Sequence, residues 1–326
     1  MIELLTNKML YIIKKDLNAL EDGLYQEVRS DVPLITDIGK HLVEAGGKRL
    51  RPALYFLAAH SSQKYDLERV LPLAVTIELI HMASLVHDDV LDNAATRRGA
   101  PTANAKWGNN ISILSGDFLF ARAFALIADK NYDRRILLRL AKVICGLSEG
   151  EIHQNEKHYK LRSETEYYNA ITKKTADFIA ASCEIGGIVA EMDITAVQCL
   201  YKYGLYLGMA FQITDDILDL TSNEKKIGKP AGNDILQGII TLPVIRAAST
   251  SPYKQELIEL ITNKNLTAVM VKRAVEITRD SDGIDYAHKK VYSYLNAAKQ
   301  ILPTGLPTNI AKSFIEITDF VNKRDF

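Results

Sequence analysis

The chain has 326 residues, of which 47% are hydrophobic and 25% charged, an ordinary balance for a globular protein with a sizeable core. Its 40 basic and 40 acidic residues leave no net charge, which argues against nucleic acid as the main partner. The three cysteines, Cys145, Cys183 and Cys199, lack metal-type spacing, so we expect reduced, packed thiols. No secretory signal and no uninterrupted apolar run of about 18 residues is evident, and we therefore expect a soluble, cytoplasmic protein.

Proline placement predicts an all-α fold. No proline occurs between Pro101 and Pro230, and apolar residues in this stretch recur at three-and-four spacing, which indicates consecutive helices. The strict alternation that is typical of half-buried strands is missing. Because there is no low-complexity tract and no linker, we predict a single all-helical domain over residues 1–326, with roughly ten or more helices.

Taken in chain order, the pattern predicts helices over residues 4–28, 32–45, 51–60, 71–92, 111–129, 134–159, 163–190, 195–220 and 241–249. Shorter amphipathic helices follow from residue 253 to 326, interrupted by Pro303 and Pro307. Residues 93–102 are predicted to form a polar loop. Residues 221–238 are polar and contain glycines, and the segment is long enough to be a mobile flap.

The helix predicted over residues 71–92 ends in three carboxylates, Asp88, Asp89 and Asp92. On a helix, Asp88 and Asp92 share one face and Asp89 lies beside them. Like charges this close repel one another unless a cation lies between them, and Mg²⁺ prefers carboxylate oxygens that it can share with substrate phosphates. Taken alone, the group would also suit a solvated acidic helix end.

The same Asp-Asp-x-x-Asp pattern returns at Asp215, Asp216 and Asp219, again after an apolar helix. Two copies so far apart are hard to explain as two solvated faces. If the two helices face each other, all of these carboxylates converge, and such a site needs several cations and a polyanionic ligand.

Basic and polar residues near these groups suit a phosphate ligand. The segment Gly46-Gly47-Lys48-Arg49-Leu50-Arg51 places Lys48 and Arg51 on one face at a helix start. A glycine turn with exposed basic residues is the ordinary alternative. Arg97 and Arg98 follow the first acidic group and could grip a diphosphate with bidentate forks; as a lone pair on a loop they would usually be solvated. Further candidates, each with an ordinary core or surface alternative, are His81, Lys174, Thr175, Gln212 and Lys229.

Together these motifs resemble the all-trans polyprenyl diphosphate synthases of the head-to-tail isoprenyl synthase family, nearly from end to end. The run from His81 to Asp89 and the ending Lys323-Arg324-Asp325-Phe326 are most similar to the catalytic component II of two-component heptaprenyl or hexaprenyl diphosphate synthases. The resemblance implies the isoprenoid synthase fold, a helical bundle around a deep central cavity. It also implies a prenyltransferase that condenses isopentenyl diphosphate onto an allylic diphosphate such as farnesyl diphosphate.

The resemblance further implies a role for each candidate residue. Isopentenyl diphosphate would be bound by Lys48, Arg51, His81 and Arg98. Roughly two or three Mg²⁺ ions on the allylic diphosphate would be held by Asp88, Asp92, Asp215 and Asp219, with Asp89 and Asp216 assisting. The allylic substrate and its leaving group would also contact Arg97, Lys174, Thr175, Gln212 and Lys229. Many relatives carry a further lysine where this chain has Ile239, which cannot bind phosphate.

Product length in this family depends on an apolar tunnel below the first aspartates. Ile80, Ala83 and Ser84 precede Asp88 on the side that would line it, and their small or aliphatic side chains predict a product of roughly C30 to C40 by analogy. A quinone side chain, such as that of menaquinone, is the implied use. The implied assembly is a homodimer or a heterodimer with a small non-catalytic subunit, with transient membrane association through the product.

Four other interpretations remain open at this point. A shorter-chain geranylgeranyl or farnesyl diphosphate synthase would share every motif. A class I terpene cyclase needs no isopentenyl site at Lys48 and Arg51. A di-metal bundle would need two Glu-x-x-His pairs, of which only Glu78 to His81 fits. A non-catalytic binding subunit would not need both aspartate motifs intact.

Overall fold

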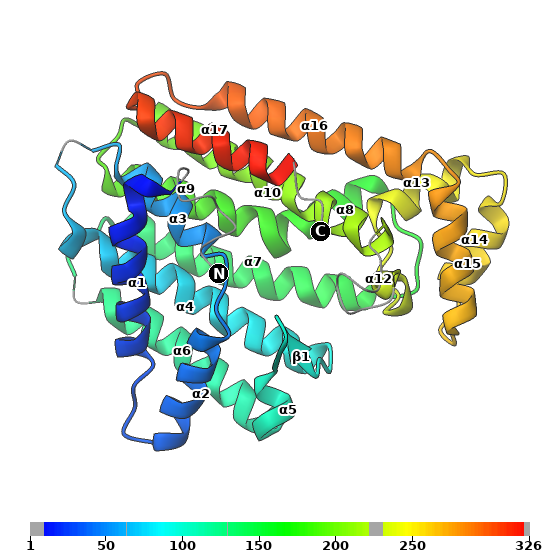
Figure 1. Ribbon diagram of the computed structural model, residues 1–326, viewed down its shortest axis with the longest axis horizontal. Helices are drawn as coiled ribbons and strands as arrows, with labels where there is room; N and C mark the ends of the chain where they lie inside the picture. The colour runs from blue at the N-terminus through cyan, green and yellow to red at the C-terminus, as the bar shows by residue number, and fades with distance from the viewer. Residues whose placement is uncertain (1–9, 63, 129, 222–230, 323–326) are drawn as a thin grey trace. The chain divides into compact units, whose positions relative to one another are not determined.

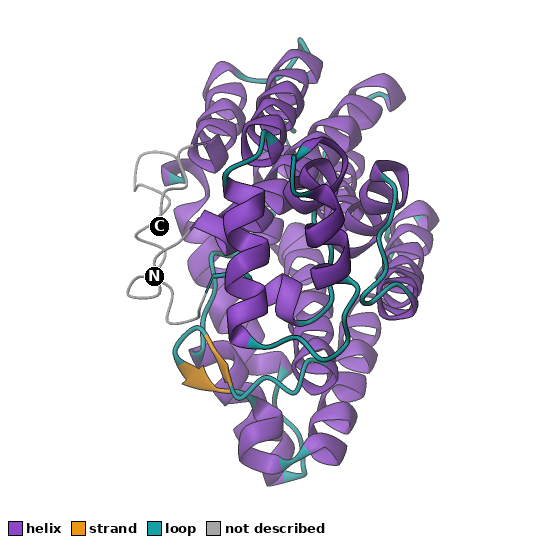
Figure 2. Cartoon of the chain, turned by 90° about the vertical axis from the view of Figure 1, so that its right-hand side faces the viewer, coloured by secondary structure: helices purple, strands orange, loops and turns teal. Residues whose placement is uncertain are grey.

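The computed structural model describes residues 10–62, 64–128, 130–221 and 231–322 (Figure 1). Within these ranges the chain is helical almost throughout, with a single pair of two-residue strands (Figure 2). The predicted all-α fold is therefore confirmed. Residues 222–230 of the predicted flap, which include Lys229, and the ending Lys323-Arg324-Asp325-Phe326 lie outside the described residues.

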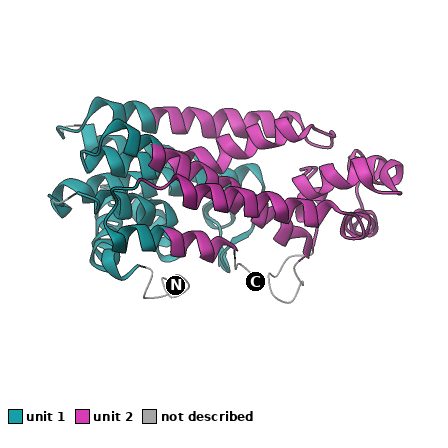
Figure 3. Ribbon diagram, turned by 90° about the horizontal axis from the view of Figure 1, so that it is seen from above, with its two compact units in different colours: residues 1–140, 182–198, 304–314 teal, residues 141–181, 199–303, 315–326 magenta. Residues whose placement is uncertain are grey.

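The chain divides into two compact units (Figure 3). Unit 1 comprises residues 1–140, 182–198 and 304–314, and unit 2 comprises residues 141–181, 199–303 and 315–326. The first aspartate group belongs to unit 1 and the second to unit 2. Whether the whole chain is one domain stays a prediction.

Unit 1 is organised around helix α4. Eight of the ten residues of its neighbour α3 are buried because nearly all of them are apolar, and α4 packs against α1, α3, α5 and α6. Much of α4 is therefore buried, and its Thr76 hydroxyl donates a hydrogen bond to the Ala123 carbonyl at 3.1 Å. The elements are η2 (Tyr11–Ile13), α1 (Lys14–Glu27), α2 (Pro33–Glu44), α3 (Leu50–Ala59), α4 (Leu67–Leu91), α5 (Ala103–Trp107) and α6 (Asn109–Ala128).

Two sequence expectations in unit 1 need correction. Helix α4 begins at Leu67 rather than at Leu71, because Asp66 caps it by accepting a hydrogen bond from the Glu68 N–H at 3.0 Å, and Pro72 lies inside the helix. The predicted loop of residues 93–102 contains a hairpin of β1 (Thr96–Arg97) and β2 (Ala100–Pro101). Arg98 (φ 54°) and Gly99 (φ 81°) form its turn, with both φ angles positive as in a tight two-residue hairpin.

In unit 2, the long helix predicted over residues 163–190 is interrupted by a π-helical turn, η3 (Thr172–Ala176). Pro303 and Pro307 separate the last two helices as predicted. The elements that lie wholly or partly in unit 2 are α7 (Arg134–Glu156), α8 (Glu164–Ile171), η3, α9 (Asp177–Val189), α10 (Ile194–Thr221), α12 (Asn233–Leu236), α13 (Leu242–Thr250), α14 (Lys254–Ile261), α15 (Ala268–Arg279), α16 (Gly283–Ile301) and α17 (Thr308–Asn322).

Two glycines one turn apart let α10 approach its neighbours closely. A Cβ on Gly208 would lie 2.5 Å from the Ala176 Cα, and one on Gly204 would lie 2.6 Å from the Ala180 Cα. No side chain fits at such distances, so backbone packs directly on backbone here. This contact fixes α10, which carries the second aspartate group, against η3.

Two helices, α4 and α6, are long and apolar enough to cross a membrane by length and composition alone. Neither contains an uninterrupted apolar run of that length, since Glu78 interrupts α4 and Asp117 and Arg122 interrupt α6. In α4, 67% of the apolar window is buried inside the protein, as expected of a core helix.

Candidate functional site

The first aspartate group lies at the carboxyl end of α4. Asp88 falls in the last turn and is partly exposed, whereas Asp92 is the C-cap residue and is exposed. The carboxyl end of a helix carries partial negative charge, so carboxylates there are destabilising. The group therefore gains more from a bound cation than the same residues would gain elsewhere on a helix.

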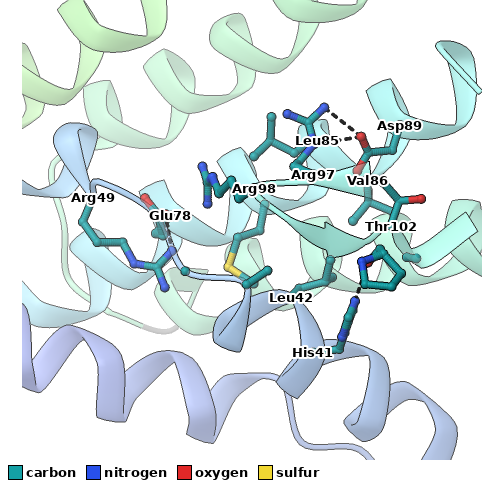
Figure 4. A pocket seen from close by; sticks show the side chains of 15 residues that line it. His41, Leu42, Arg49, Glu78, Leu85, Val86, Asp89, Arg97, Arg98 and Thr102 are labelled. Carbon is teal, nitrogen blue, oxygen red and sulfur yellow. Dashed lines mark hydrogen bonds and ion pairs between the residues drawn. The ribbon is translucent and has the colours of Figure 1, made fainter. Parts of the chain in front are cut away.

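Asp89 has a different environment from its two neighbours. It is 4% exposed, and its Oδ1 accepts hydrogen bonds from the Arg97 guanidinium at 2.8 Å (Figure 4). His41 of α2 donates to the Pro101 carbonyl at 2.8 Å and so ties the hairpin to the unit. Asp89 therefore orients Arg97, and Asp88 and Asp92 present the more accessible carboxylates.

Arg49, which the sequence analysis did not single out, anchors the basic turn before α3. Its guanidinium is 2% exposed and pairs with Glu78 at 2.7 Å (Figure 4) and with Glu21, also at 2.7 Å. Burial by itself lowers the pKa of Arg49, but these hydrogen bonds and carboxylate charges raise it on balance. The buried pairing fixes the turn from which Lys48 and Arg51 project.

Arg51 and His81, which the resemblance assigns to the same substrate, lie in contact. Arg51 Nη1 and His81 Nε2 are 3.2 Å apart, and because an arginine can only donate, the histidine nitrogen is the acceptor. Burial, followed by the charge of Arg51 and of further arginines, holds the pKa of His81 well below its usual value. Burial also lowers the pKa of Arg51 to about 10. His81 is therefore neutral at physiological pH.

This neutral histidine predicts a pH-dependent stability. Below its ordinary pKa of about 6.5, His81 binds a proton in the unfolded chain but not in the folded one, so acidification favours unfolding. Between about pH 7.5 and about pH 5.5, we expect it to remove about 1 kcal/mol of stability. Thermal unfolding of the wild type and of His81→Gln at both pH values checks this. An identical acid-induced decrease of Tm in the two proteins would contradict it.

The three residues predicted to control product length precede Asp88 on α4. Ile80 and Ala83 are both 0% exposed, whereas Ser84 is partly exposed and its hydroxyl donates to the His81 carbonyl at 2.9 Å. The structure thus separates one accessible position from two core positions.

The second aspartate group lies near the carboxyl end of α10. Asp216 is 4% exposed, and each of its oxygens accepts a hydrogen bond, from the Tyr167 hydroxyl at 2.6 Å and from Gln212 Nε2 at 2.9 Å. Burial raises the pKa of Asp216 to about 7, although these two hydrogen bonds oppose the change. Asp216 therefore joins α10 to α8 through Tyr167. The partly exposed Asp215 and Asp219 are better placed to contact a cation.

Lys174 and Thr175 lie on η3, the π-helical turn of unit 2. π-helical turns often occur at functional sites. Lys174 pairs with Glu151 at 3.0 Å, and the Thr175 hydroxyl donates to Gln212 Oε1 at 2.8 Å. The predicted substrate-contacting residues Lys174, Thr175 and Gln212 are thereby brought next to the second aspartate group.

Asp234, on the short helix α12, is a site residue that the sequence analysis missed. Its backbone N–H donates to Asp219 Oδ2 at 3.3 Å. Burial, and then the charges of Asp219 and Asp216, raise the pKa of Asp234 well above its ordinary value. No recognisable spacing links this residue to the aspartate motif.

The carboxylates fit a divalent cation that is shared with a ligand. Among the described residues, no three acidic, histidine or cysteine side chains are grouped closely enough to hold a metal. Mg²⁺ commonly takes only one or two carboxylates from the protein and fills its remaining positions with water and substrate phosphates. Pairs such as Asp88 with Asp92 suit that arrangement.

Comparison with known proteins identifies the class. The polyprenyl synthetase family model matches residues 32–278. The chain therefore belongs to the polyprenyl synthetase family and is a prenyl-transferring enzyme, as the resemblance implied.

Relatives within the family share almost the whole chain. The heptaprenyl diphosphate synthase component 2 of Geobacillus stearothermophilus is 40% identical over 320 residues, which cover 98% of each chain. The crystal structure of a polyprenyl synthase from Caulobacter crescentus CB15, complexed with calcium and isoprenyl diphosphate, has a TM-score of 0.90 at 34% identity, again covering 98% of each chain. Heptaprenyl diphosphate synthase from Staphylococcus aureus has a TM-score of 0.89 at 32% identity and covers 96% of this chain and 99% of the other.

Proposed function

We propose that the protein condenses isopentenyl diphosphate head-to-tail onto an allylic diphosphate, with farnesyl diphosphate as the favoured primer. The proposed product is a long all-trans polyprenyl diphosphate of roughly C30 to C40, used for a quinone side chain such as that of menaquinone. The observation that carries the proposal is the repeated pair of accessible aspartates, each at the carboxyl end of an apolar helix. The 40% identity to a heptaprenyl diphosphate synthase component supports the long chain.

In this proposal the basic residues of unit 1 bind isopentenyl diphosphate. Arg51 and the exposed Arg98 supply charge-assisted hydrogen bonds to its phosphate oxygens, and Lys48 adds a third cation at the start of α3. The neutral His81 holds Arg51 without adding a charge of its own.

The allylic diphosphate is assigned to the aspartates. Asp88, Asp92, Asp215 and Asp219 would hold roughly two or three Mg²⁺ ions. Arg97, oriented by Asp89, and Lys174, held by Glu151, would contact the phosphate oxygens, as would Lys229. Asp216 would keep Asp215 and Asp219 in register through its bonds to Tyr167 and Gln212.

The reaction begins when the allylic carbon–oxygen bond breaks and charge develops on the departing diphosphate. Arg97, held by Asp89, and Lys174, held by Glu151, would stabilise that charge because each is held in position before the bond breaks. Mg²⁺ held by Asp88, Asp92, Asp215 and Asp219 would supply Lewis-acid stabilisation worth roughly several kcal/mol. The isopentenyl double bond then attacks the allylic cation, and the departing diphosphate takes the proton that is lost. Water must be excluded, because it would quench the cation.

A small residue at position 47 is predicted to matter for substrate binding rather than for stability. A Cβ on Gly47 would lie 2.7 Å from Arg98 Nη1, which is the flexible end of a side chain and can move aside. We expect Gly47→Ala to raise the KM for isopentenyl diphosphate about tenfold, through the loss of about one charge-assisted hydrogen bond. Steady-state kinetics with each substrate varied in turn measure this. Gly305→Ala, at a site with open space around it, is the matched control. An unchanged KM would contradict the assignment of Arg98.

We also propose a dimeric assembly, either with a second copy or with a small unlike subunit. Unit 1 exposes large apolar side chains on α6 and at the start of α7, where Ile113, Leu114, Leu137 and Leu138 are 42%, 64%, 46% and 50% exposed. Exposed apolar side chains such as these gain from burial against a partner. The name component 2 of the relative is in keeping with an unlike subunit. Membrane association would arise only transiently, through the product.

The test is a product assay with the purified protein, Mg²⁺, labelled isopentenyl diphosphate and farnesyl diphosphate. Long labelled polyprenyl diphosphates, abolished by a chelator, are expected. A single addition would support the shorter-chain alternative, and a cyclic hydrocarbon would support a terpene cyclase. If no product forms, the assay is repeated with a small subunit from a two-component synthase, and continued inactivity would contradict the proposal.

A further inference from the structure

Unit 2 contains a cavity of about 80 Å³ beside the second aspartate group. Since one buried water needs roughly 10–15 Å³ by this measure, the cavity has room for several waters or for a phosphoryl group. Its walls come from α7, the segment before α8, η3, α10 and the residues around α12. The residues that line it include Arg162, Lys174, Asp216, Asp234 and Ile239.

Arg162 is the unexplained member of this set. It is 8% exposed, its Nε donates to the Ile240 carbonyl at 2.7 Å, and its guanidinium lies 5.2 Å from the centre of the Tyr167 ring. Within the described part of the chain it makes no other hydrogen bond and no ion pair. An arginine carries five N–H donors, and a buried guanidinium without a carboxylate partner is costly. Asp216 and Asp234 lie near enough for their charges to act on Arg162, but neither accepts a hydrogen bond from it, so its remaining donors suit an anionic ligand.

The cavity combines charges of both signs in a way that suits a metal-bound diphosphate. The lining carries two cationic side chains, Lys174 and Arg162, and the carboxyl groups of Asp216 and Asp234. Phosphoryl oxygens need the cations, and the metal ions that accompany a diphosphate need carboxylates close by. Neither a purely cationic pocket nor a purely acidic one would serve both needs.

Ile239 lines this same cavity, at the position where many proteins that the sequence resembles carry a lysine. The structure places the Arg162 side chain against the backbone of the neighbouring residue, Ile240. Position 239 therefore contributes no cation to the cavity wall, and Arg162 contributes one from a distant point in the sequence.

We propose that Arg162 binds a phosphoryl oxygen of the allylic diphosphate and of the pyrophosphate released from it, in place of a lysine at position 239. The inference rests on the proposed function and deepens it. A purely structural role, in which Arg162 only balances the charges of Asp216 and Asp234, is the alternative that the experiment must separate from it.

The experiment is isothermal titration of the purified full chain with inorganic pyrophosphate in the presence of Mg²⁺. Loss of one buried charge-assisted contact should weaken the binding of pyrophosphate to Arg162→Met by about tenfold to a hundredfold. Arg246→Met is the matched control, because Arg246 also lies over a tyrosine ring, at 4.8 Å from the centre of Tyr286, but pairs with Asp282 away from the cavity. Its pyrophosphate affinity should equal that of the wild type.

Relocating the charge makes the test specific. In the Arg162→Met background, Ile239→Lys should restore pyrophosphate binding to within a few-fold of the wild type, an outcome that a merely structural arginine does not predict. A folded Arg162→Met protein with wild-type affinity overturns the proposal, as does a wild type that does not bind pyrophosphate. If Arg162→Met does not fold, Ile239→Lys alone decides: tighter pyrophosphate binding supports the proposal, and unchanged or weaker binding overturns it.

The result can be told apart from a failure of the proposed function. A wild type that makes no prenyl product, yet binds pyrophosphate in an Arg162-dependent way, would overturn the proposed condensation and leave this assignment in place. A wild type that makes product, while Arg162→Met binds pyrophosphate normally, would overturn this assignment alone.

Discussion

Replacing either Asp88 or Asp215 by asparagine is expected to lower the rate of product formation by about a thousandfold. Asparagine keeps the size and shape of the side chain but removes the negative charge that a divalent cation requires. Metal stabilisation of a departing diphosphate is worth several kcal/mol, and each 1.36 kcal/mol or so corresponds to about a factor of ten in rate. The loss of one ligand from either aspartate group should therefore be severe.

The measurement is the initial rate of isopentenyl diphosphate incorporation as a function of Mg²⁺ concentration. We expect both variants to need more Mg²⁺ and to remain slow at saturation. Asp117→Asn is the control, because Asp117 has a 61% exposed side chain on α6 and its nearby basic group is His87, at 3.6 Å; it should retain wild-type activity. Full activity of Asp215→Asn at ordinary Mg²⁺ would remove the second group from the metal site.

The helices could be predicted from the sequence because a local pattern specifies them. The absence of proline between Pro101 and Pro230 and the three-and-four apolar spacing were sufficient for the all-α fold. The hairpin could not be predicted in this way, because strands of two residues are too short to show alternation. The π-helical turn that carries Lys174 also escaped, since one extra residue in a helix leaves no local signal.

The residues of the candidate site likewise divide into those that a local pattern predicts and those that only the folded chain brings together. Asp88 and Asp92 could be paired from their spacing alone, because four residues bring two side chains to the same helical face. Tyr167 could not be linked to Asp216, since 49 positions separate the two residues in the sequence and only the folded chain places them 2.6 Å apart. Arg162 and Asp234 were missed for the same reason. Arg49 was passed over in favour of Lys48 and Arg51, because a sequence does not show which of several neighbouring cations is buried.

Ser84→Phe is expected to shorten the product by about two isoprene units or more. Ser84 lies one helical turn before Asp88, about 6 Å along α4, so a phenyl ring there would occupy space into which the growing chain is proposed to extend. Because Ser84 is partly exposed, the ring can be accommodated without overpacking a core. Ala83 is 0% exposed, and Ala83→Phe should instead destabilise the protein by about 1–3 kcal/mol.

Chromatography of the hydrolysed products, together with thermal unfolding, distinguishes these two effects. Ser84→Ala removes the hydroxyl that bonds to the His81 carbonyl at 2.9 Å but adds no volume, so its product should match that of the wild type. If Ser84→Phe gives shorter chains at an unchanged first-addition rate, the ring acts on elongation alone and leaves the proposed diphosphate site at the aspartates, one turn away, intact. A Ser84→Phe protein that folds normally and yields the wild-type product would place the growing chain on another face of α4, away from Ser84.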